Sequence, residues 1–260
     1  MDLQLSRKIA LVTGASRGIG LATVRALEAE GVRVVAASRS ISDGLRSTGA
    51  ITIPADLSHP DAPAELVAAT IEKLGGLDIL VNNVGGGDGA QLGGLLDFDD
   101  ATWRDTFELN FFAAMRTARA AMPGLLASGG VIVNISSIGA KVPGGNPLPY
   151  ASAKAALDAF GKSMSEEFGP RGVRVKTVSP GPVRTAMWES PDGHGAKLAE
   201  SLGISHEALL QAMPGQLGLT TGRLVEPEEV AAFVTYLTSP LADSIVGSDH
   251  LIDAGAVKSV

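Results

Sequence analysis

Short apolar runs alternate with longer amphipathic stretches along this chain of 260 residues. The apolar runs have the length and composition of strands that are covered on both faces of a parallel sheet. We expect seven such strands, at residues 9–12, 32–37, 50–54, 79–81, 131–135, 172–178 and 250–253. Helical patterns fill the intervals at residues 21–30, 61–73, 100–128, 150–168 and 226–237. The second has Ser58 or Asp61 as its cap, and the third is one long helix or two short ones.

Strands and helices alternate from one end of the chain to the other, without a linker or an internal repeat. This order is typical of an α/β domain in which right-handed crossovers build a doubly wound parallel sheet with helices on both faces. We therefore predict a single domain over residues 1–260 with a seven-stranded parallel sheet. Only residues 186–223 break the rhythm, with scattered glycines and a weak helical pattern at 208–213. An insertion of this length predicts a substrate lid or a binding loop.

Composition excludes several classes of function. The net charge of −7 argues against a nucleic-acid partner, which would require a basic face. Cysteine is absent, and the four histidines (59, 194, 206 and 250) lack metal-ligand spacing, so we expect no metal. No apolar run approaches the ~18 residues of a membrane span, and residues 1–8 are too polar for a signal peptide. We expect a cytoplasmic protein with no membrane partner.

A glycine-rich turn follows the first predicted strand and leads directly into a helical pattern. It contains Gly14, Gly18 and Gly20. Glycines let the backbone approach a pyrophosphate closely, and a helix N-terminus presents N–H groups to it. The order of strand, glycine turn and helix therefore predicts a dinucleotide site.

The end of the second predicted strand bears on the choice of dinucleotide. An acidic residue at this position would bind a ribose 2′-hydroxyl, whereas a basic one accommodates a 2′-phosphate. The chain has Ser38 and Arg39 there, and Arg17 lies within the glycine turn. Two cations and no carboxylate favour NADP(H) over NAD(H).

Other polar residues follow predicted strands at the edge where open α/β sheets bind ligands. Asp56 follows the third strand and is either an adenine-binding residue or a turn former. Asn82 begins a run of amides and glycines after the fourth strand, and Ser137 follows the fifth.

Tyr150 and Lys154 are separated by one turn at the start of a helical pattern. They lie on the same helix face. A free tyrosine has a pKa of about 10, and a fixed positive charge beside it lowers that pKa. The pair can then pass a proton to or from a substrate oxygen.

These motifs resemble the short-chain dehydrogenase/reductase family over almost the whole chain. The resemblance rests on Thr13-Gly14-x-x-x-Gly18-Ile19-Gly20, Asn82-Asn83-x-Gly85, Asn110, Ser137, Tyr150-x-x-x-Lys154 and Pro180-Gly181, in the family's order and spacing. Two departures are Val84, where the family usually has alanine, and Ala254, where it more often has glycine. The resemblance implies a Rossmann fold and an oxidoreductase.

The resemblance also implies a role for each catalytic residue. Tyr150 would be the acid/base, and Lys154 would lower the pKa of Tyr150 and hold the nicotinamide ribose. Ser137 would orient the substrate oxygen, and Asn110 would anchor a water that links Lys154 to solvent. The cofactor set is Gly14, Ser16, Arg17, Gly18, Ile19, Gly20, Ser38, Arg39, Asp56, Leu57, Asn82, Val84, Gly85, Tyr150, Lys154, Pro180, Gly181, Val183 and Thr185.

The leading hypothesis is an NADPH-dependent carbonyl reductase, similar to ketoacyl reductases, that acts on a small-molecule ketone or secondary alcohol. The alternatives are an NAD-dependent alcohol or sugar dehydrogenase and a non-catalytic module that senses dinucleotide. Apolar side chains in residues 186–223, including Met187, Trp188, Leu198, Leu202 and Met213, suggest a moderately apolar substrate pocket. Small residues along 150–168, together with the long helix at 100–128, suggest a homodimer or homotetramer.

Overall fold

The computed structural model describes residues 1–86, 95–144 and 146–258. Its central feature is one parallel sheet of seven strands in the order β3-β2-β1-β4-β5-β6-β7. The strands are β1 (Ile9–Thr13), β2 (Arg33–Ser38), β3 (Ile51–Pro54), β4 (Ile79–Asn82), β5 (Val131–Ile135), β6 (Arg174–Pro180) and β7 (Asp249–Ile252). The prediction of a doubly wound α/β fold is confirmed.

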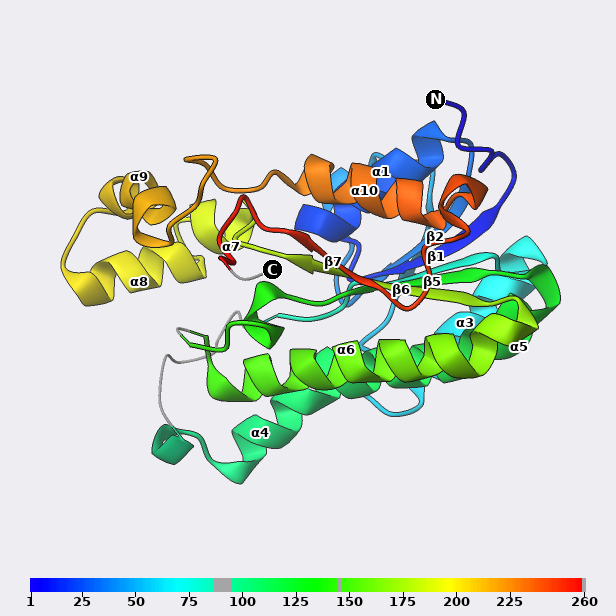
Figure 1. Ribbon diagram of the computed structural model, residues 1–260, viewed down its shortest axis with the longest axis horizontal. Helices are drawn as coiled ribbons and strands as arrows, with labels where there is room; N and C mark the ends of the chain where they lie inside the picture. The colour runs from blue at the N-terminus through cyan, green and yellow to red at the C-terminus, as the bar shows by residue number, and fades with distance from the viewer. Residues whose placement is uncertain (87–94, 145, 259–260) are drawn as a thin grey trace.

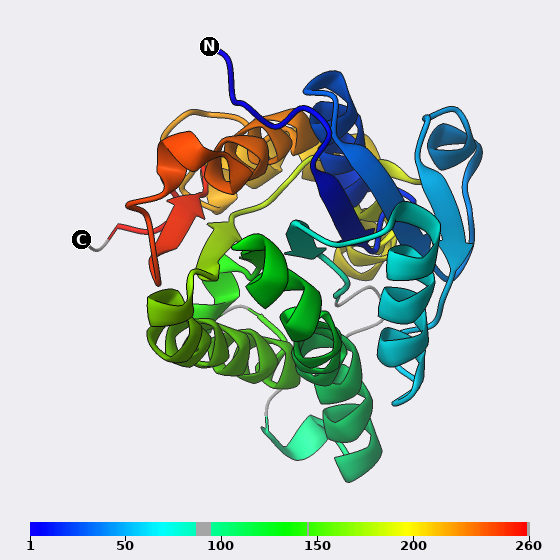
Figure 2. The same cartoon turned by 90° about the vertical axis from the view of Figure 1, so that its right-hand side faces the viewer.

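Two layers of helices cover the sheet. The helices are α1 (Gly18–Ala29), α2 (Asp43–Arg46), α3 (Ala62–Leu74), α4 (Asp100–Phe107), α5 (Ala113–Ser128), α6 (Leu148–Phe168), α7 (Ala186–Glu189), α8 (His194–Leu202), α9 (His206–Gln216) and α10 (Pro227–Thr238). In Figure 1, α1 and α10 lie above the sheet and α3, α5 and α6 lie below it. Figure 2 shows the same layers from the side, with the strands between them.

The sandwich of sheet and helices explains why the central strands β1, β4 and β5 are mostly apolar. Successive side chains of a strand point to opposite faces. On β1, Ala10 and Val12 belong to the core under α1 and α10, while Leu11 belongs to the core against α3 and α5. Burial on both faces therefore favours apolar residues at successive positions of β1.

Some helices and strands begin or end at other residues than predicted, in two cases because of a glycine turn. The strand predicted at 172–178 lies at Arg174–Pro180, because Gly172 has a φ of +88° and forms the turn before it. The helix predicted from residue 21 begins at Gly18, inside the glycine turn. The helix predicted at 100–128 contains a π-helical turn, η2 (Glu108–Phe112), between α4 and α5.

Residues 186–223 contain more helix than the sequence pattern indicated. The structure has α7, α8 and α9 there, of which only part of α9 was expected. Figure 1 shows α8 and α9 beyond the end of the sheet, on the same side as α7. No helix in the described parts of the chain is both long and apolar enough to cross a membrane.

Ala254 has a φ of +56°, which is strained for an L-residue with a side chain. The left-handed conformation costs such a residue about 1–2 kcal/mol, whereas glycine adopts it freely. We expect Ala254→Gly to raise the free energy of unfolding by about 0.5 kcal/mol, because relief of strain exceeds the loss of a partly buried methyl group. Denaturant titration measures the change. Ala256→Gly is the control and should lower stability, and an Ala254→Gly protein less stable than wild type would contradict this account.

Candidate active site

The strand order reverses between β1 and β4, because β1 pairs with both β2 and β4. Open α/β sheets bind ligands outside the carboxyl ends of the strands at such a point. The glycine turn follows β1, Val84 and Gly85 follow β4, Ser137 follows β5 and Gly181 follows β6. The fold therefore gathers site residues that are far apart in sequence.

Lys154 is buried at the centre of this region and is 3% exposed. Its Nζ donates a hydrogen bond of 2.9 Å to the backbone oxygen of Ile135 and lies 5.8 Å from the centre of the Tyr150 ring. Burial lowers the pKa of Lys154 to about 8, and the negative charge of Asp158 opposes that effect. The structure thus places a poorly hydrated ammonium beside the phenol.

Asn110 is fully buried in η2, where the widened turn places its amide against the chain after β4. Its Oδ1 accepts from the backbone N–H of Gly86 at 2.9 Å, and its Nδ2 donates to the oxygens of Gly86 and Thr106 at 3.1 and 3.0 Å. A Cβ atom on Gly85 would lie 2.9 Å from both Asn110 Oδ1 and Lys154 Nζ. These two polar atoms therefore border the same small space.

Ser137 is half-buried directly after β5 and begins the short helix η3 (Ile138–Ala140). Its Oγ accepts a hydrogen bond of 3.0 Å from the N–H of Gly139. Ser136 is buried, and its Oγ donates to the backbone oxygen of Lys154 at 3.4 Å. The end of β5 is thus joined to the first turns of α6, which carry Tyr150.

The glycine turn is packed too closely for side chains. Gly14 and Gly18 have φ values of +64° and +53°, and a Cβ atom on Gly20 would lie 2.3 Å from the oxygen of Gly14. A Cβ atom on Gly18 would lie 3.0 Å from the methyl carbon of Thr185. The start of α1, with Ile19 half-buried, therefore faces the loop that follows β6.

Thr13 and Asn83 brace this turn, a role that the sequence analysis missed. Thr13 Oγ1 accepts from the backbone N–H groups of Asn83 and Val84 at 3.0 and 3.1 Å. Asn83 Nδ2 donates to the oxygens of Thr13 and Gly14, both at 3.0 Å. Hydrogen bonds of both residues thus join the ends of β1 and β4.

The side chain of Asn82 is buried away from the turn. Its Nδ2 donates to Asn134 Oδ1 at 2.9 Å and to the oxygen of Ala114 at 3.5 Å. Leu57 is also buried, in the core against α3. Any contact of these two residues with a dinucleotide would therefore use their backbone.

The end of β2 carries Ser38, which is buried and donates to the oxygen of Ser40 at 2.6 Å, and Arg39, which is exposed. Asp56 Oδ1 accepts from the hydroxyl and the N–H of Ser58 at 2.8 and 3.1 Å. These bonds, with a smaller contribution from the Arg39 charge, lower the pKa of Asp56. Asp56 therefore has the local bonds of a turn former and stays ionised near Arg39.

Ser42 joins the glycine turn to the chain after Arg39. Its Oγ donates to the oxygen of Ser16 at 2.6 Å and accepts from the N–H of Leu45, which caps α2. This short helix was not predicted. It fixes the loop that carries Arg39 beside the glycine turn.

The chain after β6 is held by contacts with the end of β7 and with the segment before α10. Gly181 N–H donates to the oxygen of Ile252 at 3.0 Å after Pro180 ends β6, and a Cβ atom on Gly181 would lie 2.7 Å from Asp253 Cα. Val183 is buried and forms a bridge with Val225. The loop is therefore tied to the segment that leads into α10.

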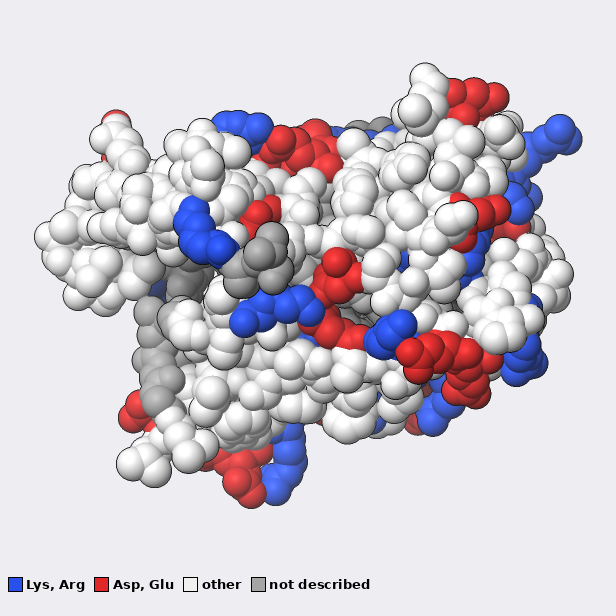
Figure 3. Space-filling model, in the orientation of Figure 1, with Lys and Arg blue, Asp and Glu red and all other residues white. Residues whose placement is uncertain are grey.

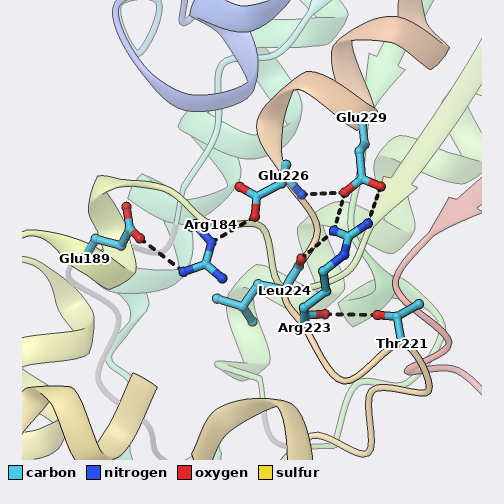
Figure 4. A network of polar contacts seen from close by, with 7 residues as sticks. All are labelled: Arg184, Glu189, Thr221, Arg223, Leu224, Glu226 and Glu229. Carbon is cyan, nitrogen blue, oxygen red and sulfur yellow. Dashed lines mark hydrogen bonds and ion pairs between the residues drawn. The ribbon is translucent and has the colours of Figure 1, made fainter. Parts of the chain in front are cut away.

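Arg184 connects the two ends of residues 186–223 (Figure 4). Its Nε donates to Glu226 Oε1 at 2.9 Å, and its NH1 donates to Glu189 at 3.3 Å. Arg223 forms a bidentate pair with Glu229 at 2.7 and 2.8 Å, and Glu229 accepts from the N–H of Glu226 at 2.9 Å. The segment thus leaves and rejoins the domain at one polar junction.

Residues 186–223 begin beside the glycine turn, because Thr185 lies against Gly18. The hydrogen bond from the Ser190 hydroxyl lowers the pKa of Asp192, which lies between α7 and α8, and the Arg17 charge makes a smaller contribution. In Figure 1, α7, α8 and α9 lie beyond the end of the sheet at which β6 leads into them, which is the carboxyl end of the strands. The segment therefore borders the region in which the site residues gather, which we call the cleft.

The apolar side chains of this segment mostly pack on one another. Ala199, Leu209 and Met213 are buried in a small core of their own, with Trp188 and Leu198 packed against it, and Leu202 is 56% exposed. Met213 and Leu202 therefore give no support to an apolar substrate pocket. The glycine-rich run at 87–94 lies outside the described residues.

No group of three or more histidine, cysteine or acidic side chains with the arrangement of a metal site occurs among the residues described. The polar groups at the cleft are instead a phenol, an ammonium, an amide and hydroxyls. They suit proton transfer and hydrogen bonding to oxygen.

A family model described as enoyl-(acyl carrier protein) reductase matches residues 14–257. The chain belongs to the short-chain dehydrogenase/reductase family. Among the family's members, L-fucose dehydrogenase from Mus musculus is 34% identical over 96% of this chain and 89% of its own length. A 3-oxoacyl-[acyl-carrier-protein] reductase from Vibrio cholerae is 32% identical over 97% of this chain and 98% of its own length.

Solved structures of the short-chain dehydrogenase/reductase family agree with this assignment. L-sorbose reductase from Gluconobacter frateurii, complexed with NADPH and L-sorbose, has a TM-score of 0.91 and 31% identity and covers 100% of both chains. A single-residue variant of actinorhodin polyketide ketoreductase with NADPH has a TM-score of 0.87 and 31% identity over 97% of this chain and 98% of its own. The chain is an oxidoreductase that transfers hydride between a nicotinamide dinucleotide and a carbonyl or alcohol carbon.

Proposed function

We propose that this protein is an NADP(H)-dependent reductase of ketones and, in reverse, a dehydrogenase of secondary alcohols. The observation that carries the proposal is the buried Lys154 ammonium 5.8 Å from the Tyr150 ring. In this arrangement, Tyr150 is the proton donor for a carbonyl oxygen during reduction and the acceptor during oxidation. Lys154 stabilises the ionised phenol.

The residues at the switch point fit a dinucleotide. At the start of α1, a helix of 12 residues, Gly14, Gly18 and Gly20 have no side chains that would cover the backbone. Such a terminus offers N–H groups to a pyrophosphate. Val183 and Thr185 would hold the carboxamide and the phosphates, and Thr185 faces Gly18 across the turn. The bound dinucleotide would supply the hydride, and the chain supplies placement and the proton.

Ser137 and Asn110 complete the proposed proton-transfer site. Ser137 Oγ already accepts from Gly139 and keeps its own hydrogen for a substrate oxygen. Asn110 Oδ1 and Lys154 Nζ approach Gly85 so closely that a side chain at residue 85 would collide with both. A water bound by Asn110 would carry a proton between Lys154 and solvent.

Arg39 and Arg17 support the preference for NADP(H). Both are exposed at the edge of the cleft, and Ser42 holds the loop after Arg39 against Ser16 in the glycine turn. Guanidinium groups bind phosphate oxygens well, and no carboxylate follows β2 directly to favour a free 2′-hydroxyl.

Residues 186–223 are proposed as the substrate lid, because they border the cleft and join the domain at the Arg184 junction. Relatives include a sugar reductase and ketoacyl reductases, so we propose a polyol or a 3-oxoacyl compound as the substrate class. A homodimer or homotetramer, a cytoplasmic location and a single domain over 1–260 stay predictions.

Calorimetric titration of NADPH and NADH into wild type and Arg39→Ala tests the cofactor preference. We expect NADPH to bind at least roughly tenfold more tightly than NADH, a difference of about 1.4 kcal/mol, and Arg39→Ala to lose that margin. Arg46→Ala is the control, since Arg46 is exposed on α2 and binds the oxygen of Ile41. Tighter binding of NADH would favour the NAD-dependent dehydrogenase.

Turnover tests the catalytic assignment, with an acetoacetyl thioester, L-sorbose and L-fucose as probes. Tyr150→Phe should lower kcat by about 10²–10⁴-fold without changing dinucleotide affinity, because only the transferable proton is lost. Tyr236→Phe, in α10, is the matched control and should keep full activity. Dinucleotide binding with no turnover in wild type, or equal turnover in wild type and Tyr150→Phe, would contradict the assignment.

A further inference from the structure

Three charged side chains meet between α6, β7 and the loop of residues 138–144 that follows Ser137. Lys141 Nζ lies 2.8 Å from Asp158 Oδ2 and 2.5 Å from Asp249 Oδ2. Asp249 Oδ1 also accepts from Ser179 Oγ at 2.8 Å. We call Lys141, Asp158 and Asp249 the Lys141 cluster. In Figure 3, basic and acidic atoms adjoin in the area over α6 and β7.

The two acidic side chains of the cluster are mostly buried, with 13% and 20% of their side chains exposed for Asp158 and Asp249. Burial raises the pKa of Asp158, and the nearby Asp249 charge adds to the rise, while Lys141 and Ser136 oppose it. Two buried carboxylates without a cation between them would repel each other strongly. Lys141 therefore has a greater effect here than an exposed ion pair would have.

The position of Lys141 in the chain lets its ion pairs connect the loop after Ser137 to α6 and β7. Lys141 directly follows η3, which begins after Ser137, and its partners lie on α6 and β7. The backbone N–H groups of Lys141 and Val142 both donate to the nearby oxygen of Ile138, within the loop itself. Among the described residues of this loop, Lys141 makes the ion pairs to distant elements.

We propose that Lys141 is a positioning residue of the active site: its bonds to Asp158 and Asp249 hold the loop after Ser137 against α6, and so hold Ser137 in register with Tyr150. The catalytic part of this inference rests on the proposed function. Asp158 lies one turn after Lys154 on α6, so charges alternate from Asp249 through Lys141 and Asp158 to Lys154.

Other titratable groups near the cluster point elsewhere. Lys176, on β6, bonds to the oxygens of Leu237 and Ala242, on the α10 side of the sheet. His250, next to Asp249, packs against Phe233 of α10. Strand alternation places Asp249 on the opposite face, toward α6. On α6, Lys162 pairs with Glu166, whereas the Asp158 charge acts on Lys154.

Hydrogen exchange tests the inference without substrate or cofactor. In Lys141→Met, we expect amides 139–142 to exchange at least roughly tenfold faster than in wild type, because the loop loses its bonds to α6 and β7. Lys141→Arg should restore most of the protection. Lys162→Met is the matched control, since it removes an exposed ion pair with Glu166 on the same helix and should leave these amides unchanged. Unchanged exchange in Lys141→Met, or equal effects of Lys141→Met and Lys162→Met on the exchange of these amides, would overturn the proposal.

The pH dependence of stability gives a second readout. Lys141→Met removes the cation that opposes the rise in the pKa of Asp158, so the folded-state pKa of Asp158 lies further above its unfolded value. A raised acid pKa costs stability that grows as pH rises through it. The Tm difference between wild type and Lys141→Met should therefore be larger at pH 8 than at pH 5. A difference that is independent of pH would mean that Lys141 contributes packing alone, against the proposal.

Turnover separates failure of this inference from failure of the proposed function. With the acetoacetyl thioester and sugar probes, Lys141→Met should raise KM by roughly threefold or more and leave NADPH affinity unchanged. If loop exchange is faster in Lys141→Met but Tyr150→Phe is fully active, the proposed function is contradicted and the positioning role of Lys141 in the loop is supported. If Tyr150→Phe is inactive but loop exchange is normal in Lys141→Met, the proposed function is supported and the role of Lys141 is contradicted.

Discussion

An ammonium group held almost without water is the constraint on which the site depends. Lys154 is 3% exposed, and an isolated buried cation costs far more than a single hydrogen bond returns. Its surroundings are arranged to compensate: the Ile135 oxygen accepts from it, the Tyr150 ring faces it, and the Asp158 charge opposes the loss of its proton. The Lys154 charge acts strongly on the ionisation of the Tyr150 phenol, because little solvent screens it.

Close packing excludes side chains from the part of the cleft proposed to bind the dinucleotide. Gly20 lies so close to the oxygen of Gly14 that a methyl group cannot be accommodated, and a side chain on Gly85 would collide with Asn110 Oδ1 and Lys154 Nζ. Thr13 and Asn83 hold the strand ends together around this bare backbone. The parallel sheet supplies rigidity, and the glycines supply access.

The strand pattern predicted the sheet because burial on both faces leaves a strong signal in a sequence such as Val131 to Ile135. The juxtaposition of Tyr150 with Lys154 followed from helix periodicity alone. Other features depend on long-range contacts. The π-helical turn around Asn110 and the bonds of Lys141 to Asp158 and Asp249 have no local pattern that reveals them. The hydrophobicity of an apolar residue such as Met213 does not predict whether it faces a substrate or packs in a small separate core, as Met213 does.

Titration of Tyr150 itself tests the central claim most directly. The chain has two tyrosines, so Tyr236→Phe leaves Tyr150 as the only one, and tyrosinate absorbance then follows its ionisation without substrate or cofactor. The account predicts that Tyr150 ionises at lower pH with Lys154 present than in Tyr236→Phe/Lys154→Met, where its pKa should rise to about 10 or above. An unchanged midpoint in the two proteins would show that Lys154 does not act on Tyr150 and would contradict the account.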